Sequence, residues 1–345
     1  MKRIVFFITR FSVLEKKVTS WRYGDSNLVF SKDRLSLRTK TFYDITVNTI
    51  SKQTISCNTE VEFWHLVLTS DILPQETMQK LREIEQTNRF MHIVLVESGD
   101  ESIYSENTYV SVDDAIRASI SKVLDQQQDE VLFATVNLDD DDGICRRYLE
   151  MLADHMSEKT VGYGVSFARG FKVGFNYEDS TLENLRHWYF PKVNVGLAYI
   201  NRYRPGVGAT LNEIFHILNA GSHTNIDAKI PVIVDGREPA YIYTMNNTND
   251  SGDDDGIWLE LPQANPTQIE RYFPSQFKFS SKLHSEDAVA RSEPPELPPN
   301  KAAGQHRLML MYARREASMR QQIIRLFSKL RAKLSHLSKK DRHLT

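Results

Sequence analysis

Four consecutive aspartates, Asp139–Asp142, are the residues of this chain best suited to metal chemistry. They follow the apolar, β-branched run Glu130–Val136, which predicts a buried strand, and a helical pattern begins after them at Tyr148. In open α/β sheets, ligands bind at the carboxyl ends of strands, where this loop would lie. Two carboxylates about 6 Å apart repel by about 0.7 kcal/mol in water, and a hard divalent cation relieves that repulsion. The pattern therefore predicts a D-x-D site at Asp139 and Asp141 for Mg²⁺ or Mn²⁺ and a diphosphate.

Several other kinds of site are excluded by their spacing. Counting back from Gly143 puts Leu138 where an EF-hand loop needs its first aspartate. The sequence has no P-loop, and the stretch Gly162–Phe167 lacks the third glycine of a dinucleotide fingerprint. No G-x-S-x-G turn supports a Ser/His/Asp hydrolase. The interpretation that stays open beside the metal site is a solvated acidic loop.

Predicted strands and helices alternate through the first half of the chain. Ser111 is expected to cap the helix that precedes the aspartates. The predicted strands are Arg3–Ile8, Phe63–Leu68, Met91–Val96 and Glu130–Val136, and the predicted helices are Leu35–Ile50, Gln75–Gln86 and Val112–Leu124. This alternation favours an α/β fold with a mostly parallel, Rossmann-like sheet flanked by helices.

The second half is expected to contain mixed strands and to bind the acceptor of a reaction. Val161–Phe167 and Gly170–Phe175 predict a hairpin around Ala168–Arg169. Further predicted elements are strands at Lys192–Ile200, Lys229–Val234 and Ala240–Met245 and a short helix at Thr210–Leu218. We therefore expect one domain over residues 1–280, with a nucleotide-binding half at 1–143 and an acceptor half at 144–280.

The C-terminal region has a different composition. Residues 282–300 are rich in Ser, Glu and Pro, which is typical of a linker. Residues 301–345 contain twelve Lys or Arg and two Asp or Glu, and apolar residues recur at gaps of three and four from Met319 to Leu337. This pattern predicts a basic amphipathic helix. It could lie on an anionic membrane surface or pair with another helix, and both options stay open.

Composition limits the class of protein. The chain has 345 residues, of which 41% are hydrophobic, so it can bury a sizeable core. A formal net charge of −2 argues against nucleic acid as a general partner. The two cysteines form no CxxC motif, and no apolar run approaches the length that spans a bilayer. We expect a cytoplasmic protein, with peripheral contact at the inner membrane face through residues 301–345 as an option.

Polar residues at the ends of the other predicted strands are expected to contact a nucleotide sugar. The carboxyl ends of parallel strands meet at one edge of a sheet, so these residues would lie near the aspartates. The expected contacts are Thr9, Arg10, Phe11, Asp71, Arg117, Asp139 and Asp140. Taken alone, each of the first five could equally be an ordinary turn or helix-surface residue.

These residues give the chain a resemblance to the putative rhamnosyltransferase family, bacterial glycosyltransferases related to the GT-A fold. The most specific match is Leu138–Asp142, which looks like the family's L-D-x-D-D motif. Weaker matches are Thr9–Ser12, Trp64–Val67 with Asp71 and Pro74, Phe167–Gly170 and Tyr241–Asn249. The resemblance covers roughly residues 1–280.

The resemblance implies metal-dependent transfer of a sugar from a nucleotide-sugar donor to a glycan or lipid-linked acceptor. The family's name points to rhamnose. Asp139 and Asp141 would hold Mg²⁺ or Mn²⁺, and Asp142 would orient metal-bound water or the sugar. If the reaction inverts the sugar, a carboxylate must deprotonate the acceptor hydroxyl. Asp235 and Glu238 are the candidate bases, with Glu213 as a third.

One motif departs from the family pattern. The family presents a histidine where this chain has Asn246, which becomes the third predicted metal ligand. An amide oxygen binds a transition metal more weakly than imidazole does. The departure favours, as the alternative function, a non-catalytic carbohydrate- or protein-binding member of the same fold. A nucleotidyl or phosphoryl transferase is less supported, because Thr9–Ser12 is not a glycine-rich phosphate loop.

Overall fold

A computed structural model describes residues 1–14, 26–54, 61–99, 102–206, 214–245, 259, 261–274 and 276–281. All of them belong to the first of two compact units of the chain, Met1–Ala288 and Val289–Thr345. The predicted linker at 282–300 and the predicted basic helix at 301–345 lie outside the described residues. Among the described helices, none is long and apolar enough to cross a bilayer.

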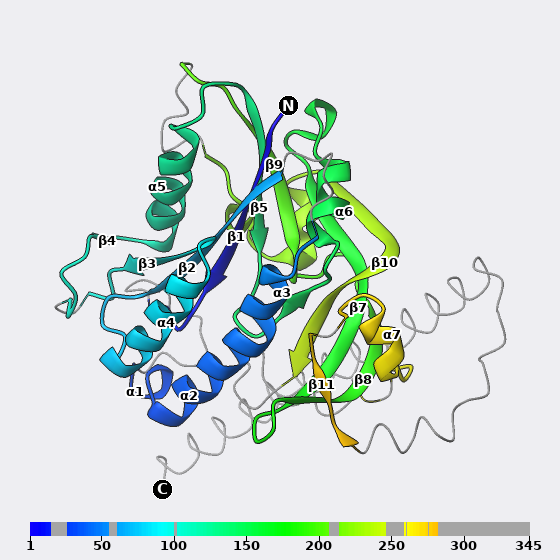
Figure 1. Ribbon diagram of the computed structural model, residues 1–345. Helices are drawn as coiled ribbons and strands as arrows, with labels where there is room; N and C mark the ends of the chain where they lie inside the picture. The colour runs from blue at the N-terminus through cyan, green and yellow to red at the C-terminus, as the bar shows by residue number, and fades with distance from the viewer. Residues whose placement is uncertain are drawn as a thin grey trace, which may run out of the picture. The chain divides into compact units, whose positions relative to one another are not determined.

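The described residues form one large mixed sheet (Figure 1). Its order is β11-β8-β7-β9-β5-β1-β2-β3-β4, and β10 pairs with both β7 and the short β6. The strands are β1 (Arg3–Arg10), β2 (Val61–Ser70), β3 (Met91–Val96), β4 (Thr108–Tyr109), β5 (Val131–Asn137), β6 (Gly143–Ile144), β7 (Gly164–Asn176), β8 (Thr181–Tyr189), β9 (Leu197–Tyr203), β10 (Val232–Met245) and β11 (Lys278–Phe279). The fold is therefore a mixed α/β architecture around a central sheet.

The first half of the sheet is parallel, as the sequence predicts. Strand β1 runs parallel to both β2 and β5 and lies between them. Residues Ile4–Thr9 of β1 are fully buried, because helices cover both faces of the strand. This burial explains why β1 is a continuous apolar run rather than an alternating one.

Helices form a layer on each face of this parallel half. The principal ones are α2 (Lys32–Thr41), α3 (Asn48–Ser51), α4 (Gln75–Thr87), α5 (Val112–Leu124) and α6 (Tyr148–His155). Ile4, Phe6 and Ile8 of β1 pack with α5, whereas Val5 and Phe7 pack with α3 and α6 on the opposite face. Smaller elements are α1 (Ser26–Val29), α7 (Pro266–Glu270) and the 3₁₀ turns Glu158–Thr160, Ile217–Ala220 and His223–Ala228.

The predicted helices of the first half are confirmed, with one addition. α2 continues through a π-helical segment, η1 (Phe42–Val47), directly into α3. The predicted helix Leu35–Ile50 is thus one continuous helical stretch with a π segment in its middle. Ser111 caps α5 as predicted, because its Oγ accepts a hydrogen bond from the Asp114 backbone N–H at 3.1 Å.

The predicted hairpin around Ala168–Arg169 is wrong. Strand β7 runs without a break from Gly164 to Asn176, and its hairpin partner is β8. The separate strands predicted at 229–234 and 240–245 are likewise one strand, β10, with register shifts between Asp235 and Tyr241. Pairing with neighbours on both sides keeps β7 extended, and irregular pairing accommodates Gly236 and Pro239 of β10.

Two further predictions around β9 need correction. The strand predicted at Lys192–Ile200 begins only at Leu197, because Gly196 adopts a positive φ of 68° in the preceding turn. In the helix predicted at Thr210–Leu218, residues 214–216 are not helical, and a 3₁₀ turn begins at Ile217.

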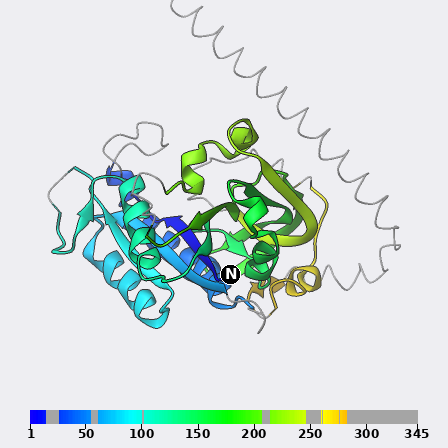
Figure 2. The ribbon, with the colours of Figure 1, turned by 90° about the horizontal axis from the view of Figure 1, so that it is seen from above.

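Figure 2 shows the first half of the chain, blue to cyan, on one side of the molecule and the strands of the second half, green to yellow, on the other.

Candidate active site

The aspartate loop, Asp139–Asp142, begins where β5 ends, as predicted. The Leu138 backbone N–H donates to the Ile8 carbonyl at 3.1 Å, which places the loop beside the end of β1. The Asp142 backbone N–H then closes a turn onto the Asp139 carbonyl at 3.2 Å. After the turn, β6 pairs antiparallel with β10. The loop therefore lies where the parallel half of the sheet meets β10.

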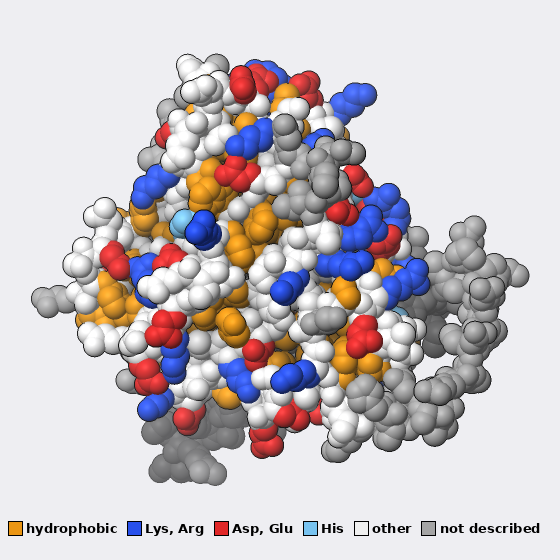
Figure 3. All heavy atoms as spheres, in the orientation of Figure 1, with side chains coloured by type: hydrophobic (Ala, Val, Ile, Leu, Met, Phe, Trp, Pro, Cys, Tyr) orange, Lys and Arg blue, Asp and Glu red, His pale blue; other side chains and the backbone are white. Residues whose placement is uncertain are grey.

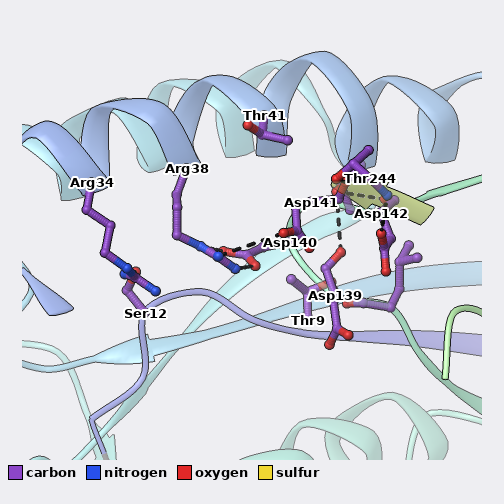
Figure 4. A network of polar contacts seen from close by, with 12 residues as sticks. Thr9, Ser12, Arg34, Arg38, Thr41, Asp139, Asp140, Asp141, Asp142 and Thr244 are labelled. Atoms are coloured by element: carbon purple, nitrogen blue, oxygen red, sulfur yellow. Dashed lines mark hydrogen bonds and ion pairs between the residues drawn. The ribbon is translucent and has the colours of Figure 1, made fainter. Parts of the chain in front are cut away.

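Arg38 of α2 holds the second aspartate of the loop (Figure 4). Its guanidinium makes two contacts with the Asp140 carboxylate, of which Nε to Oδ2 is 2.8 Å, and both side chains are buried. The Arg38 Nη1 atom also lies 3.8 Å from Asp141 Oδ2. A bidentate arginine–carboxylate pair fixes orientation as well as charge. Asp140 thus anchors the loop, and its 1% exposure leaves little surface for the nucleotide contact predicted for it.

The fourth aspartate is held by β10 and by the π segment. Asp142 Oδ1 accepts a hydrogen bond from the Thr244 backbone N–H at 2.9 Å, and its carbonyl accepts one from Thr46 Oγ1 at 2.9 Å. Burial raises the pKa of the Asp142 carboxyl well above its usual range, and the negative charges of Asp141 and Asp139 raise it further. Three carboxyl groups therefore lie within electrostatic reach of one another, which is a place where a cation would be stabilising.

Asp139 and Asp141 are the two predicted metal ligands. Asp139 is the most exposed of the four aspartates, and its Oδ2 accepts a hydrogen bond from Asn194 Nδ2 at 3.0 Å. Thr244 Oγ1 donates to the Asp141 carbonyl at 2.5 Å, so β10 also fixes the backbone of this residue. In Figure 4 the Asp139 carboxylate points away from Arg38, toward the opposite side of the loop from Asp140.

The donor set fits a cation that is completed by its substrate. No group of three His, Cys, Asp or Glu among the described residues is placed to hold a metal ion by itself. Mg²⁺ is usually bound by one or two carboxylates together with water and substrate phosphates. Asp139 and Asp141 would supply the two carboxylates of such a site. The third predicted ligand, Asn246, lies outside the described residues.

Thr9 connects the end of β1 to the loop, and His65 of β2 completes this connection. Thr9 Oγ1 donates to the Leu138 carbonyl at 2.7 Å and lies 2.8 Å from His65 Nε2. A hydroxyl has one proton, which Thr9 gives to Leu138, so His65 must donate from Nε2–H. Nδ1 is buried and has no hydrogen-bond partner among the described residues. Burial, and to a lesser degree the neighbouring His92, lower the pKa of His65 to about 3.

The other residues predicted to contact the nucleotide lie at the same sheet edge but have structural partners. Phe11 is buried against Phe42, with ring centroids 5.5 Å apart, and Arg10 is half-buried at the end of β1. Asp71 is 1% exposed, and its Oδ1 accepts hydrogen bonds from the backbone N–H and the Oγ of Ser98. Asp71 therefore ties the end of β2 to the segment after β3.

Arg117 belongs to a separate polar network at the start of α5. Its Nε contacts Asp113 at 2.7 Å, and its Nη2 donates to Asn219 Oδ1 at 3.3 Å. His216 Nε2 lies 2.7 Å from the same Asp113 carboxylate. Burial raises the pKa of Asp113, but hydrogen bonds from Arg117, Asn219 and His216 lower it overall, to about 2. These contacts tie Arg117 to Asp113 and Asn219.

The two described candidate bases are ion-paired away from the loop. Asp235 accepts from Arg237 Nη2 at 2.7 Å and contacts His155 Nε2 at 3.0 Å, and the hydrogen bonds outweigh burial and lower its pKa. Asp235 pairs with Phe167 of β7, whereas Thr244, which contacts the loop, pairs with Val173. Phe167 and Val173 are six residues apart, which corresponds to about 20 Å along a strand. A base must lie within hydrogen-bond reach of its proton, so the structure does not bring Asp235 to the loop.

Glu238 lies in the same charged region. It contacts Arg147 Nη1 at 3.3 Å, and both side chains are largely exposed. Figure 3 shows acidic and basic side chains intermingled over α6 and β10. Glu213, the third candidate base, lies outside the described residues.

Sequence reasoning missed the residues that hold the loop. Arg38 and Thr46 of one helical stretch, Asn194 and Thr244 contact it from three separate segments, and no local spacing connects them with the aspartates. Gly143, which directly follows the loop, is a residue type that the sequence could have marked as structurally required. A Cβ there would lie 3.0 Å from the Thr49 side chain, so the close packing on α3 favours glycine.

A separate cavity lies between α5 and strands β2–β4. Its volume is about 550 Å³, and its lining includes Trp64, His92, Tyr109 and Lys122. The rings of Trp64 and His92 are 4.8 Å apart. None of the predicted site residues lines this cavity, so it does not bear on the chemistry of the aspartate loop.

Comparison with known proteins decides the family. Residues 5–256 match the family described as "putative rhamnosyl transferase". The chain belongs to this family. The resemblance inferred from the sequence is thereby confirmed, and the family description supports a transferase. No curated protein matches the chain.

Among solved structures with a distant likeness is a nucleotidyltransferase. It is the inositol-1-phosphate CTP transferase from T. maritima, with 10% sequence identity and a TM-score of 0.28. The match covers 79% of this chain and 98% of that one. So distant a likeness carries no information about function.

Proposed function

We propose that this member of the family is a metal-dependent glycosyltransferase of the GT-A type. The donor would be a nucleotide sugar, with rhamnose as the sugar suggested by the family description. The acceptor would be a glycan or a lipid-linked sugar. The nucleotide would lie across the carboxyl ends of β1, β2 and β5, where the aspartate loop is placed.

The observation that carries the proposal is that the four aspartates differ in burial and in hydrogen-bond partners. Asp140 and Asp142 are almost fully buried and are bound by Arg38 and by the Thr244 backbone. These contacts fix the loop from both ends. Asp139 is held half-buried at the start of the loop, and Asp141 lies between the two anchors. A solvated acidic loop would not need a buried arginine, a buried threonine and a strand to hold it.

The chemistry follows from this arrangement. Asp139 and Asp141 would hold Mg²⁺ or Mn²⁺, which supplies positive charge next to the departing nucleoside diphosphate. Arg38 keeps Asp140 in place and brings its own charge within 3.8 Å of Asp141. Asn194 fixes the rotamer of Asp139 through Oδ2. The reacting sugar would develop oxocarbenium character, as in glycoside hydrolysis.

Loss of Asp141 tests the proposed activity. The purified chain is mixed with dTDP-, UDP- or GDP-sugars and Mn²⁺, and release of the sugar is followed with time. We expect Asp141→Ala to abolish metal-dependent release, because one of the two carboxylates proposed to hold the cation is lost. Asp129→Ala is the matched control, since Asp129 is exposed at the other end of β5. Undiminished turnover by Asp141→Ala would remove Asp141 from the metal site.

The second candidate is a non-catalytic member of the fold that binds carbohydrate or protein. It is favoured by the ion pairing of both described candidate bases away from the loop. Such a protein would bind a nucleotide or sugar without releasing product. Binding of nucleoside diphosphate with no turnover of any nucleotide sugar in the assay above would favour this candidate.

A further inference from the structure

A row of four half-buried rings extends along the acceptor half, and we name it the aromatic row. Its members are Tyr243 of β10, Trp188 of β8, Phe190 just after β8, and His223. Neighbouring ring centroids are 4.9 Å apart from Tyr243 to Trp188, 5.7 Å from Trp188 to Phe190, and 5.7 Å from Phe190 to His223. The row is therefore continuous.

The pairing of the strands explains why these rings share one face. Trp188 pairs with Gly170 of β7, and Tyr241 of β10 pairs with the same glycine from the other side. A Cβ at Gly170 would lie 2.5 Å from the Tyr241 ring, so glycine lets that ring cross β7. Tyr243 follows two residues later and therefore projects to the same side as Tyr241.

A buried lysine lies close to two rings of the row. Lys172 is 4% exposed, and its Nζ lies 5.0 Å from the centroid of Trp188 and 5.4 Å from that of Tyr243. An ammonium over a ring face is attracted by the quadrupole of the ring. Lys172 is thus placed to hold both rings in fixed orientations.

The aromatic row approaches the aspartate loop through Asn194. The Phe190 carbonyl accepts from the Val193 backbone N–H at 3.2 Å, and the next residue, Asn194, binds Asp139. On β10, Tyr243 precedes Thr244, but the two side chains project to opposite faces of the strand, and Thr244 is the one that faces Asp141. A ligand that reacts beside Asp139 and extends past Asn194 would therefore reach Phe190 first.

We propose that the aromatic row binds the acceptor, and that the acceptor is a glycan with at least two sugar rings beyond the reacting hydroxyl. This inference rests on the proposed glycosyltransferase function and specifies its acceptor. The faces of a sugar ring present C–H groups that pack on aromatic rings, while its hydroxyls stay hydrated at the edge. Half-buried rings with a lysine ammonium beside two of them suit such a ligand better than a lipid chain, which gains most from a closed apolar groove.

Tryptophan fluorescence of the full chain tests the proposal without turnover. The probes are a trisaccharide of α-linked rhamnose, rhamnose itself and decyl phosphate. We expect the trisaccharide to change the emission with saturation and to bind about tenfold more tightly than rhamnose, because a further ring stacks. Trp188→Ala should abolish the change and Phe190→Ala should weaken binding. Trp64→Ala is the matched control, since Trp64 is half-buried on β2 and outside the row.

The outcomes of these measurements show whether the aromatic row binds a glycan. The proposal is overturned if the trisaccharide gives no saturable change, or if Trp188→Ala and Phe190→Ala bind it like the unmodified chain. A change produced by decyl phosphate alone would assign the row to lipid. Binding of dTDP with Mn²⁺ is measured in parallel on each variant and should be unaltered by Trp188→Ala. Failure of dTDP binding in the unmodified chain would count against the proposed function and not against the row.

Discussion

At the scale of single residues, Arg38 decides how the aspartate loop is held. Arg38→Met would leave the buried Asp140 carboxylate without its bidentate partner. Removing one member of a buried ion pair costs about 3–5 kcal/mol, so we expect the free energy of unfolding to fall by about that amount. Urea-induced unfolding, followed by circular dichroism, measures the change.

The double variant Arg38→Met, Asp140→Leu separates charge from packing. It removes both charges together, and we expect it to recover most of the lost stability. Lys32→Met is the control, because Lys32 is highly exposed on the same helix and should change stability by less than about 0.5 kcal/mol. Equal stabilities of Arg38→Met and the unmodified chain would show that the pair does not hold the loop.

Protonation of His65 should make the free energy of unfolding depend on pH. The pKa of His65 is lowered from 6.5 to about 3 by burial, so the unfolded state binds a proton that the folded state excludes. Stability should therefore fall as pH decreases through the window from about 6.5 to about 3, with a contribution approaching 1.4 kcal/mol per pH unit. Above this window both states are neutral, and the contribution is fully present.

His65→Gln tests this dependence. Glutamine can still donate to Thr9 but does not titrate, so the variant should lose less stability than the unmodified chain between pH 6.5 and pH 4. Unfolding in urea at several pH values gives the two curves. If the curves run parallel, His65 is not the titrating group.

The sequence could predict where the aspartate loop lies but not how it is held. The loop follows an unmistakable apolar strand, and strand ends are where ligands bind. By contrast, Arg38 and Asp140 are 102 residues apart, and nothing in either local sequence marks them as partners. The position of Thr9 predicts a nucleotide contact, whereas in the structure its hydroxyl contacts the Leu138 carbonyl and His65.

At the scale of elements, the helical stretch from Lys32 to Ser51 is the principal support of the site. Arg38 contacts Asp140, Thr46 contacts the Asp142 carbonyl, and Thr49 accepts from the Ile144 backbone N–H at 3.2 Å. The π segment lies between Arg38 and Thr49. π segments often occur at functional sites, where the extra residue per turn changes which side chains face a neighbour.

Strand β7 offers a sharp test at this scale. Gly170→Ala would place a Cβ 2.5 Å from the Tyr241 ring and 2.6 Å from the Tyr241 carbonyl oxygen. Since backbone cannot move aside easily, we expect the free energy of unfolding to fall by about 1–3 kcal/mol. Gly174→Ala is the matched control on the same strand, because its nearest contact is the flexible Glu183 side chain at 3.1 Å. Equal effects of the two substitutions would contradict the close crossing of Tyr241.

The parallel half of the fold was predictable because its signals are local. Each strand is a continuous apolar run, and each helix has its own periodic face. In the second half, Ala168–Gly170 and Gly236–Pro239 resemble turns in sequence, yet both lie inside long strands. Pairing across the sheet decides their conformation, and such pairing leaves no mark in a short window of sequence.

At the scale of the whole molecule, the aspartate loop joins the two halves of the sheet. β1, β2 and β5 bring Thr9, Asp71 and the aspartate loop to one edge, and β10 closes the loop from the other half through Thr244. A ligand bound there would link the two halves. Ligand binding should therefore stabilise the fold as a unit, by about 2.7 kcal/mol at a concentration one hundred times Kd.

The most direct test is calorimetric titration of dTDP, UDP and GDP into the full chain, with and without Mn²⁺. We expect at least one nucleoside diphosphate to bind with a stoichiometry of one, to require Mn²⁺, and to lose this binding in Asp141→Asn but not in Asp129→Asn. Binding of the same strength without metal, or unchanged binding in Asp141→Asn, would contradict a metal–diphosphate site at the aspartate loop.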